Sequence, residues 1–184
     1  MMLATAGRAH SMDIPDLPPD ITFSRLPHTA EAIDFAFEAK RAAMGPHIMR
    51  RWAWDEEFQR DLHQRHFDEK PFYQIRRCET PVGTLSFQVA ADHVRFGEFY
   101  IFPGFQGQGL GSAILRHCLA LADCLGLPTR LEHLHWNPVR SLYLRHCFTD
   151  AGQSDIHIRM EREAVVSSAA GHPSPELAMS PLRQ

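Results

Sequence analysis

The sequence has no surplus of basic residues, and this shortage excludes one large class of function. Its 184 residues carry 19 lysines and arginines against 22 aspartates and glutamates, for a formal net charge of -3. A protein that binds nucleic acid by neutralising phosphates usually has a basic patch and a basic overall balance. We therefore predict that nucleic acid is not a partner of this protein.

Cysteine is also scarce, which argues against a metal centre or a disulfide framework. None of the four cysteines forms a C-x-x-C pair, and no Cys/His spacing is typical of zinc. His133 and His135 are two residues apart on an expected strand, so they share a face, but the pattern offers no third ligand. We predict reduced thiols, no metal and a cytoplasmic location.

Long apolar runs are absent. The most apolar stretch, residues 114–127, is interrupted by Arg116, His117 and Asp123, whereas a membrane span needs about 20 mostly apolar residues. Residues 1–20 contain three prolines and no continuous apolar segment, which excludes a secretory signal. We predict no membrane partner.

The remaining organisation is that of one domain between two tails. Residues 1–20 are expected to be a disordered leader, in which Met12 is an alternative start. Residues 163–184 are rich in Ala, Ser and Pro and are expected to be a disordered tail. The domain spans residues 21–162, long enough for a single core.

The apolar periodicity alternates between strands and helices, which predicts an α/β domain. Gly45-Pro46 is expected to end the first helix, and Asp55 to cap the second. The expected elements are a strand at 21–26, a helix at 29–44, a helix from 55, strands at 72–78, 82–89 and 94–102, a helix from 110 to 125, a strand at 129–136, a short helix at 138–145 and a last strand at 155–161.

A glycine-rich turn, Gln106 to Ser112, lies between an expected strand and an expected helix. Glycines let the backbone approach a ligand, and the free N–H groups of a helix N-terminus favour a diphosphate. The dinucleotide fingerprint G-x-G-x-x-G fails because its third position is Ser112, and a P-loop would need a lysine. A tight turn with no ligand is the other interpretation of these glycines.

Two motifs resemble the GNAT superfamily of N-acetyltransferases. Gln106-x-x-Gly109-x-Gly111 matches the superfamily's diphosphate loop, and Asn137-Pro138-x-x-x-Leu142-Tyr143 follows one helix and one strand later. The resemblance covers roughly residues 21–162. It departs from the family pattern at Cys147, where glycine is usual, which puts the local turn in doubt.

The resemblance implies a mixed, mostly antiparallel central sheet with flanking helices, splayed between its fourth and fifth strands. It implies acetyl-CoA as co-substrate, with the pantetheine arm in the splay and Asn137 hydrogen-bonded near it. The residues implied to hold acetyl-CoA are Phe99, Tyr100, Ile101, Gln106, Gly107, Gln108, Gly109, Leu110, Gly111, Ser112 and Asn137.

The resemblance also implies the chemistry. Tyr143 matches the family's general acid, a phenol near the thioester sulfur; a buried structural tyrosine is the alternative. For the general base the sequence offers Glu132 and Glu98, since burial can raise a carboxyl pKa toward the useful range. An exposed strand-face charge is an equally good interpretation of both, and His133 or His135 is a further choice of base.

The segment Trp52-Ala53-Trp54-Asp55-Glu56 resembles a W-G-W-D-E stretch of a bacterial GNAT subgroup. It lies between the first two helices, where the family builds its acceptor pocket. Trp52, Trp54 and Glu56 are therefore expected to bind the acceptor. The alternative is that both tryptophans belong to the core and Asp55 only caps a helix.

The predicted function is transfer of an acetyl group from acetyl-CoA to a primary amine of a small molecule. Two alternatives stay open at this point, a peptide or protein N-acetyltransferase and an acyl-CoA-binding module without turnover. Acetyl rather than a longer acyl group is the family's usual donor. A homodimer is the expected assembly if the chain associates.

Overall fold

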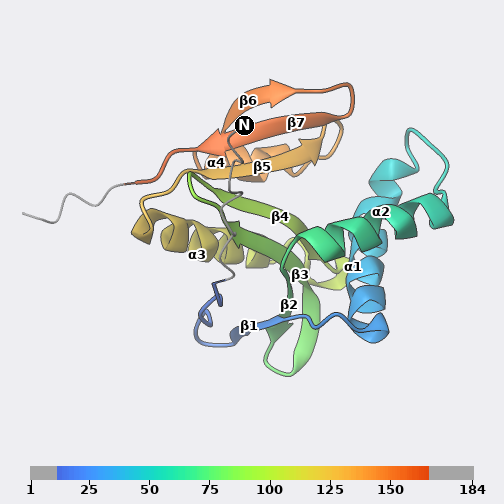
Figure 1. The fold of residues 1–184 in the computed structure, drawn as a ribbon, viewed down its shortest axis with the longest axis horizontal. Coiled ribbons are helices and arrows are strands. Elements are labelled where there is room, and N and C mark those ends of the chain that lie inside the picture. The colour runs from blue at the N-terminus through green and yellow to red at the C-terminus, as the bar shows by residue number, and fades with distance from the viewer. Residues whose placement is uncertain (1–11, 166–184) are drawn as a thin grey trace, which may run out of the picture.

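The structure is a computed structural model, and it describes residues 12–165. One seven-stranded sheet in the order β1-β2-β3-β4-β5-β7-β6 is flanked by helices (Figure 1). The strands are β1 (Ile21–Arg25), β2 (Phe72–Arg77), β3 (Thr80–Val89), β4 (Val94–Ile101), β5 (Thr129–Leu134), β6 (Thr149–Gln153) and β7 (His157–Arg162). The helices are α1 (Ala30–Ile48), α2 (Glu56–Glu69), the 3-10 turn η1 (Pro103–Phe105), α3 (Leu110–Cys124) and α4 (Arg140–Arg145).

The two faces of the sheet are covered by different helices, because strand side chains alternate. On β2, Tyr73 and Ile75 belong to the large core that α3 completes with Ile114, Leu115 and Cys118. Phe72 points the other way, into a smaller cluster with α1 and α2. The α1–α2 pair therefore lies on one face and α3 on the other. The predicted α/β class and its mixed, mostly antiparallel sheet are confirmed.

The splay predicted between the fourth and fifth strands is present. β4 and β5 run parallel and pair only at Val94 with Thr129 and at Arg95 with Arg130. Beyond these pairs the two strands separate, so the rest of the β4 edge is unpaired on that side. A bulge opposite β3 adds to the irregularity, with Glu98 at φ 46°. Bulges of this kind redirect side chains next to functional sites.

Two expected boundaries differ from the structure. The first helix does not end at Gly45-Pro46 but continues to Ile48, with Pro46 inside it. Gly45 is buried, and the Trp54 ring packs against it in ordinary van der Waals contact, 3.8 Å from the position that a Cβ would take. Tertiary packing thus overrides the local helix-breaking signal. The sequence predicts one last strand at 155–161, whereas the structure has two strands at this end of the domain, β6 followed by β7.

Residues 12–20 also pack with the domain, although the sequence analysis places them in the leader. Ile14 is buried in the core, and the Tyr73 hydroxyl donates to the Met12 carbonyl at 2.8 Å. His117 on α3 contacts the Pro15 carbonyl at 2.7 Å. The rest of the predicted leader, residues 1–11, and nearly all of the predicted tail, residues 166–184, lie outside the described residues. Among residues 12–165, no helix is long and apolar enough to cross a membrane.

Candidate active site

A cleft of about 770 Å³ opens where β4 and β5 separate. α1 and α2 line one side of the cleft, where the sequence analysis expects the acceptor to bind. α4 lines the other side. Seven residues from the sequence-predicted site line it: Trp52, Glu98, Phe99, Tyr100, Glu132, Asn137 and Tyr143. The structure thus brings together residues that are up to 91 positions apart, from Trp52 to Tyr143.

The glycine turn lies at the N-terminus of α3, just beyond the end of β4. Gly107 and Gly109 have φ values of 73° and 79°, which L side chains rarely adopt. Gly109 is the residue that caps α3, and among residues 12–165 no side chain caps the first helical N–H groups. Those groups therefore stay available to an anion, as a diphosphate site requires. Ile101 and the turn, Gln106 to Ser112, are outside the main cleft lining.

Polar side chains of the turn hold its shape. Gln106 Nε2 donates to the Ile101 carbonyl at 2.7 Å, and Gln108 Nε2 donates to the Gly104 carbonyl at 3.0 Å. Ser112 Oγ lies 2.8 Å from His146 Nε2, which joins the first turn of α3 to the end of α4. Burial and nearby arginines lower the pKa of His146, which favours the neutral ring in this contact.

Tyr143 on α4 reaches the cleft from the side opposite α1. It is buried, and its ring lies 5.9 Å from that of His133 and 5.7 Å from that of Phe148. Burial raises the pKa of Tyr143, so the phenol stays protonated over the whole physiological range. A protonated phenol is a donor, and it suits the role of an acid better than that of a base.

Cys147, two residues before β6, has φ 65°. The sequence analysis identifies this position as the one where cysteine replaces the family's usual glycine. The left-handed backbone is the conformation that glycine adopts at no steric cost. The turn after α4 therefore keeps the glycine-type geometry in spite of the cysteine.

Glu98 lies at the floor of the cleft in a buried network. Its Oε1 is 2.7 Å from Lys70 Nζ and 2.9 Å from His66 Nδ1, and its Oε2 accepts from the Tyr100 hydroxyl at 3.0 Å. Burial alone would raise the pKa of Glu98, but the hydrogen bond from His66 and the charge of Lys70 outweigh it and hold the pKa well below its usual range. Glu98 is therefore ionised and fully engaged.

Glu132 on β5 is exposed and pairs across the sheet with Arg159 of β7. Its neighbours Leu131 and His133 are buried, and Leu131 belongs to the core that Tyr143 shares. Because successive residues of a strand face opposite sides, Glu132 faces the α1–α2 side of the cleft. His133 Nδ1 donates to the Leu134 carbonyl at 2.9 Å, and burial lowers the pKa of its ring.

Trp52 lies at the mouth of the cleft and is held by an aromatic contact. Its ring packs edge-on against that of Trp136 at 4.9 Å, and Arg51 lies over the Trp136 ring at 5.1 Å. Trp136 Nε1 also donates to the His47 carbonyl at 2.9 Å. These contacts join the end of α1 and the α1–α2 loop to the end of β5.

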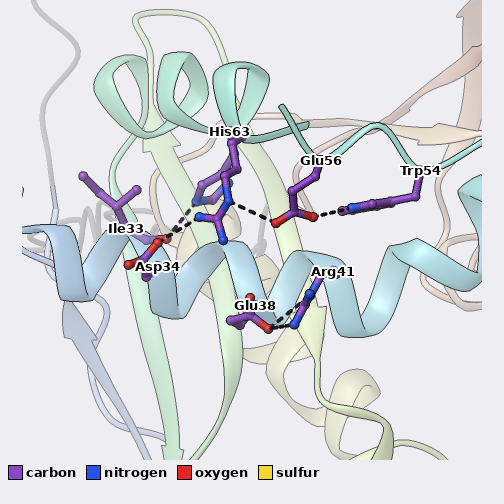
Figure 2. Close-up of polar contacts among 8 residues, drawn as sticks. Ile33, Asp34, Glu38, Arg41, Trp54, Glu56 and His63 are labelled. Carbon is purple, nitrogen blue, oxygen red and sulfur yellow. Dashed lines mark hydrogen bonds and ion pairs between the residues drawn. The ribbon is translucent and has the colours of Figure 1, made fainter. Parts of the chain in front are cut away.

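Trp54 and Glu56, the other two residues expected to bind the acceptor, do not line the cleft. Figure 2 shows the Trp54 indole directed at the Glu56 carboxylate, with Nε1 donating at 2.7 Å. Glu56 Oε1 also accepts from Arg60 at 3.0 Å, and Arg60 reaches Asp34 on α1. These hydrogen bonds connect α2 to α1. Asp55 caps α2 as predicted, because its carboxylate accepts a hydrogen bond from the Phe58 N–H.

Asn137 shapes the turn into α4. Its Oδ1 accepts from the Val139 N–H at 3.0 Å, and its Nδ2 lies 3.3 Å from the sulfur of Met44 on α1. The side chain thus joins the start of α4 to α1 on the lining of the cleft.

Sequence reasoning missed many of the polar residues that line the cleft. Four of them come from the α1–α2 side: Lys40 on α1, and Gln59, His66 and Lys70 on or after α2. Lys40 carried a readable signal, because it falls on the apolar stripe of the first helix together with Ala36 and Phe37. An ionisable residue on a buried stripe is either paired or functional. The other three carried no comparable signal. Among residues 12–165, no group of His, Cys, Asp or Glu side chains is arranged to hold a metal ion.

The splayed sheet and the glycine turn before α3 are the features that the resemblance implies for an acyl-CoA-dependent transferase fold, and the family comparison agrees with that fold. The profile of the Acetyltransferase (GNAT) family matches residues 33–148. The chain belongs to the GNAT acetyltransferase family. A search of curated protein sequences found no match to the chain.

Solved structures share the fold at low sequence identity. The PaiA N-acetyltransferase of Thermoplasma acidophilum, in complex with coenzyme A, superposes with a TM-score of 0.63 at 15% identity, covering 79% of this chain and 99% of that one. The ribosomal-protein-S18-alanine N-acetyltransferase of Escherichia coli gives 0.58 at 18% identity, covering 83% and 99%. A putative phosphinothricin N-acetyltransferase gives 0.58 at 18%, covering 79% and 99%. These likenesses show the fold.

Proposed function

We propose that this protein is an acetyl-CoA-dependent N-acetyltransferase that acts on a primary amine of a small molecule. The observation that carries the proposal is the separation of β4 from β5 after two residue pairs, beside a helix N-terminus capped by Gly109. The open edge of β4 fits an extended pantetheine arm, and the uncapped N–H groups of α3 fit its diphosphate. Both features are present in this chain and fit the same ligand.

Acetyl-CoA would supply the activated acetyl group as a thioester. The backbone of Phe99 to Ile101 would hold the pantetheine arm, and the amides of Gly107 to Ser112 the diphosphate. Asn137 would hydrogen-bond the cofactor between α1 and α4. Tyr143 would donate its phenolic proton to the departing thiolate, and its burial, which raises its pKa, keeps that proton on the phenol until the thiolate forms.

We infer that Glu132 is the general base, because it faces the side from which an acceptor enters past α1 and α2. Glu98 suits this role poorly, since its depressed pKa and three partners leave it little tendency to take a proton. Glu98 is better explained as the anchor of Lys70 and His66 at the cleft floor. Trp52 would contact the acceptor at the mouth, whereas the position of Trp54 and Glu56 lends no support to their predicted acceptor role.

The first test is acetyl-CoA binding by calorimetry. We expect measurable affinity in the wild type and about a tenfold or greater rise in Kd for Gly109→Val, because a side chain would stand between the α3 amides and the diphosphate. Gly126→Val is the matched control. Gly126 ends the same helix at φ 66° in open space, so that variant suffers similar strain far from the turn. No binding by the wild type would end the proposal, and equal losses in both variants would remove the diphosphate assignment.

The role of Glu132 is tested by the pH dependence of turnover. We expect Glu132→Gln to lower kcat/KM by about tenfold near pH 7, at the low end of general-base effects because solvent water can replace an exposed carboxylate. The loss should shrink as the pH rises and the acceptor amine deprotonates by itself. Glu163→Gln removes the same charge outside the main cleft and should not change the profile. If the pH profile of kcat/KM for Glu132→Gln runs parallel to that of the wild type, another group is the base.

A further inference from the structure

Lys40 is a buried lysine on the lining of the cleft. Its side chain projects from α1, the residue is 6% exposed, and its Nζ has no hydrogen-bond partner among the described residues. Burial lowers the pKa of Lys40, and the charge of Lys70 lowers it further against the opposing pull of Glu98. An unpaired buried ammonium costs several kcal/mol of solvation free energy, so its retention needs a reason.

The neighbouring charges do not supply that reason. Glu98 is already bonded to Lys70 and His66, and the buried His63 near Lys40 has its pKa lowered to about 4 by burial and by the charge of Lys40 itself. Asp55, which also lines the cleft, is exposed and caps α2. Lys40 is therefore left without a hydrogen-bond or ion-pair partner among residues 12–165, although Asp55, Glu98, Glu132 and Glu161 also line the cleft.

A second unpartnered atom lies in the same cleft. Gln59 of α2 is 9% exposed, and its Oε1 has no hydrogen-bond partner among the described residues. The cleft lining therefore contains an ammonium and an amide oxygen that both lack a hydrogen-bond partner among the described residues. The wall above them is apolar and comes from the facing sides of α1, the α1–α2 loop and α2: Met44, Ile48, Trp52, Phe58 and Leu62.

Lysine is rare in this chain. Lys40 and Lys70 are its only two lysines, and the other 17 of its 19 basic residues are arginine. Both lysines line the cleft. The ammonium of a lysine is a compact point charge at the end of a flexible apolar stem, and it can bind one carboxylate without the fixed planar geometry of a guanidinium.

We propose that the acceptor is an amino acid with an apolar side chain, whose carboxylate binds Lys40. The inference rests on the proposed acetyltransferase function and names its substrate class. The carboxylate neutralises the buried ammonium, Gln59 Oε1 accepts a hydrogen bond from the acceptor, and the apolar wall takes the side chain. The α-amine then remains for acetylation, while a residue inside a peptide chain lacks the free carboxylate.

The test compares free amino acids with their amides. Acetyl transfer is measured with leucine, methionine and phenylalanine, with their C-terminal amides, and with dipeptides that begin with the same residues. We expect the free acids to be preferred, and Lys40→Met to raise KM for the acids by about 10- to 100-fold, the range of one charge-assisted hydrogen bond. The KM of the amides should stay unchanged. Arg41→Met, which removes an exposed cation paired with Glu38 on the same helix, should change neither.

A binding measurement separates this inference from the function on which it rests. Protein labelled with ¹³C at lysine gives two side-chain signals, and Lys40→Met identifies one of them. Leucine should shift the Lys40 signal and leucinamide should not, whether or not turnover is observed. Acetyl-CoA binding with preferred transfer to amides or dipeptides, and an unmoved Lys40 signal, would overturn the inference and leave the acetyltransferase intact. If the wild type does not bind acetyl-CoA, the proposed acetyltransferase function itself is wrong.

Discussion

Tyr143→Phe is expected to lower kcat by about 100- to 1000-fold, the usual effect of removing a general acid. The thiolate of coenzyme A would then leave without a proton from the protein. Phenylalanine fills the same volume and keeps the ring contacts with His133 and Phe148, so folding should be unaffected. The Kd for acetyl-CoA should change by less than about twofold, because the lost group acts on the reacting sulfur.

Tyr73→Phe is the matched control for this variant. Tyr73 is buried in the same core, but its hydroxyl donates to the Met12 carbonyl away from the cleft. Its loss should lower stability by about 1 kcal/mol and leave kcat alone. Equal turnover in Tyr143→Phe and the wild type would contradict the acid role. If neither the wild type nor Tyr143→Phe acetylates any amine, and both bind acetyl-CoA, the chain is an acyl-CoA-binding module.

Most of the fold could be predicted because its elements carry local signals. The alternation of β3 and β4, the cap at Asp55 and the glycine turn before α3 each depend on nearby residues, and their positions agree with the structure within about two residues. β6 was missed because Thr149 to Gln153 is a mostly exposed edge strand with no apolar alternation. α1 runs past Gly45 because Trp54, nine residues away, packs over it, which a local pattern cannot reveal.

The candidate site was predictable only where a motif fixed it. The loop at Gly109 and the phenol at Tyr143 follow from sequence order. Tyr143 lines the cleft where β4 and β5 separate, whereas the loop follows β4 and lies outside the main cleft lining. The partners of Glu98 come from the end of α2, 28 and 32 residues earlier, so their contact depends on how the helices pack. Glu98 was a candidate base as long as its partners were unknown, and the network now gives its carboxylate a different use.

Lys70→Met is expected to lower the free energy of unfolding by about 3 kcal/mol, because it leaves the Glu98 carboxylate buried without its ammonium. For a chain of this length that loss corresponds to a fall in Tm of about 6–12 °C. The double variant Lys70→Met with Glu98→Gln should recover most of the loss, since neither charge of the Lys70–Glu98 pair remains. Arg41→Met breaks an exposed ion pair with Glu38 and should cost less than about 1 kcal/mol. Thermal and urea unfolding at pH 7.5 measure all four proteins.

The pH dependence of this effect has a definite sign. In the wild type the pKa of Glu98 lies below its ordinary value of 4.5, so the network adds stability above that value and loses it as the pH falls toward the folded-state pKa. In Lys70→Met the ammonium is gone while the His66 contact remains, so the pKa of Glu98 is lowered less than in the wild type and the carboxyl takes a proton at a higher pH. The difference in Tm between the two proteins should therefore narrow as the pH falls from 7.5 through about 4.5. A difference that stays constant over this range would mean that Lys70 stabilises the protein through the packing of its stem, and that the Glu98 charge contributes little.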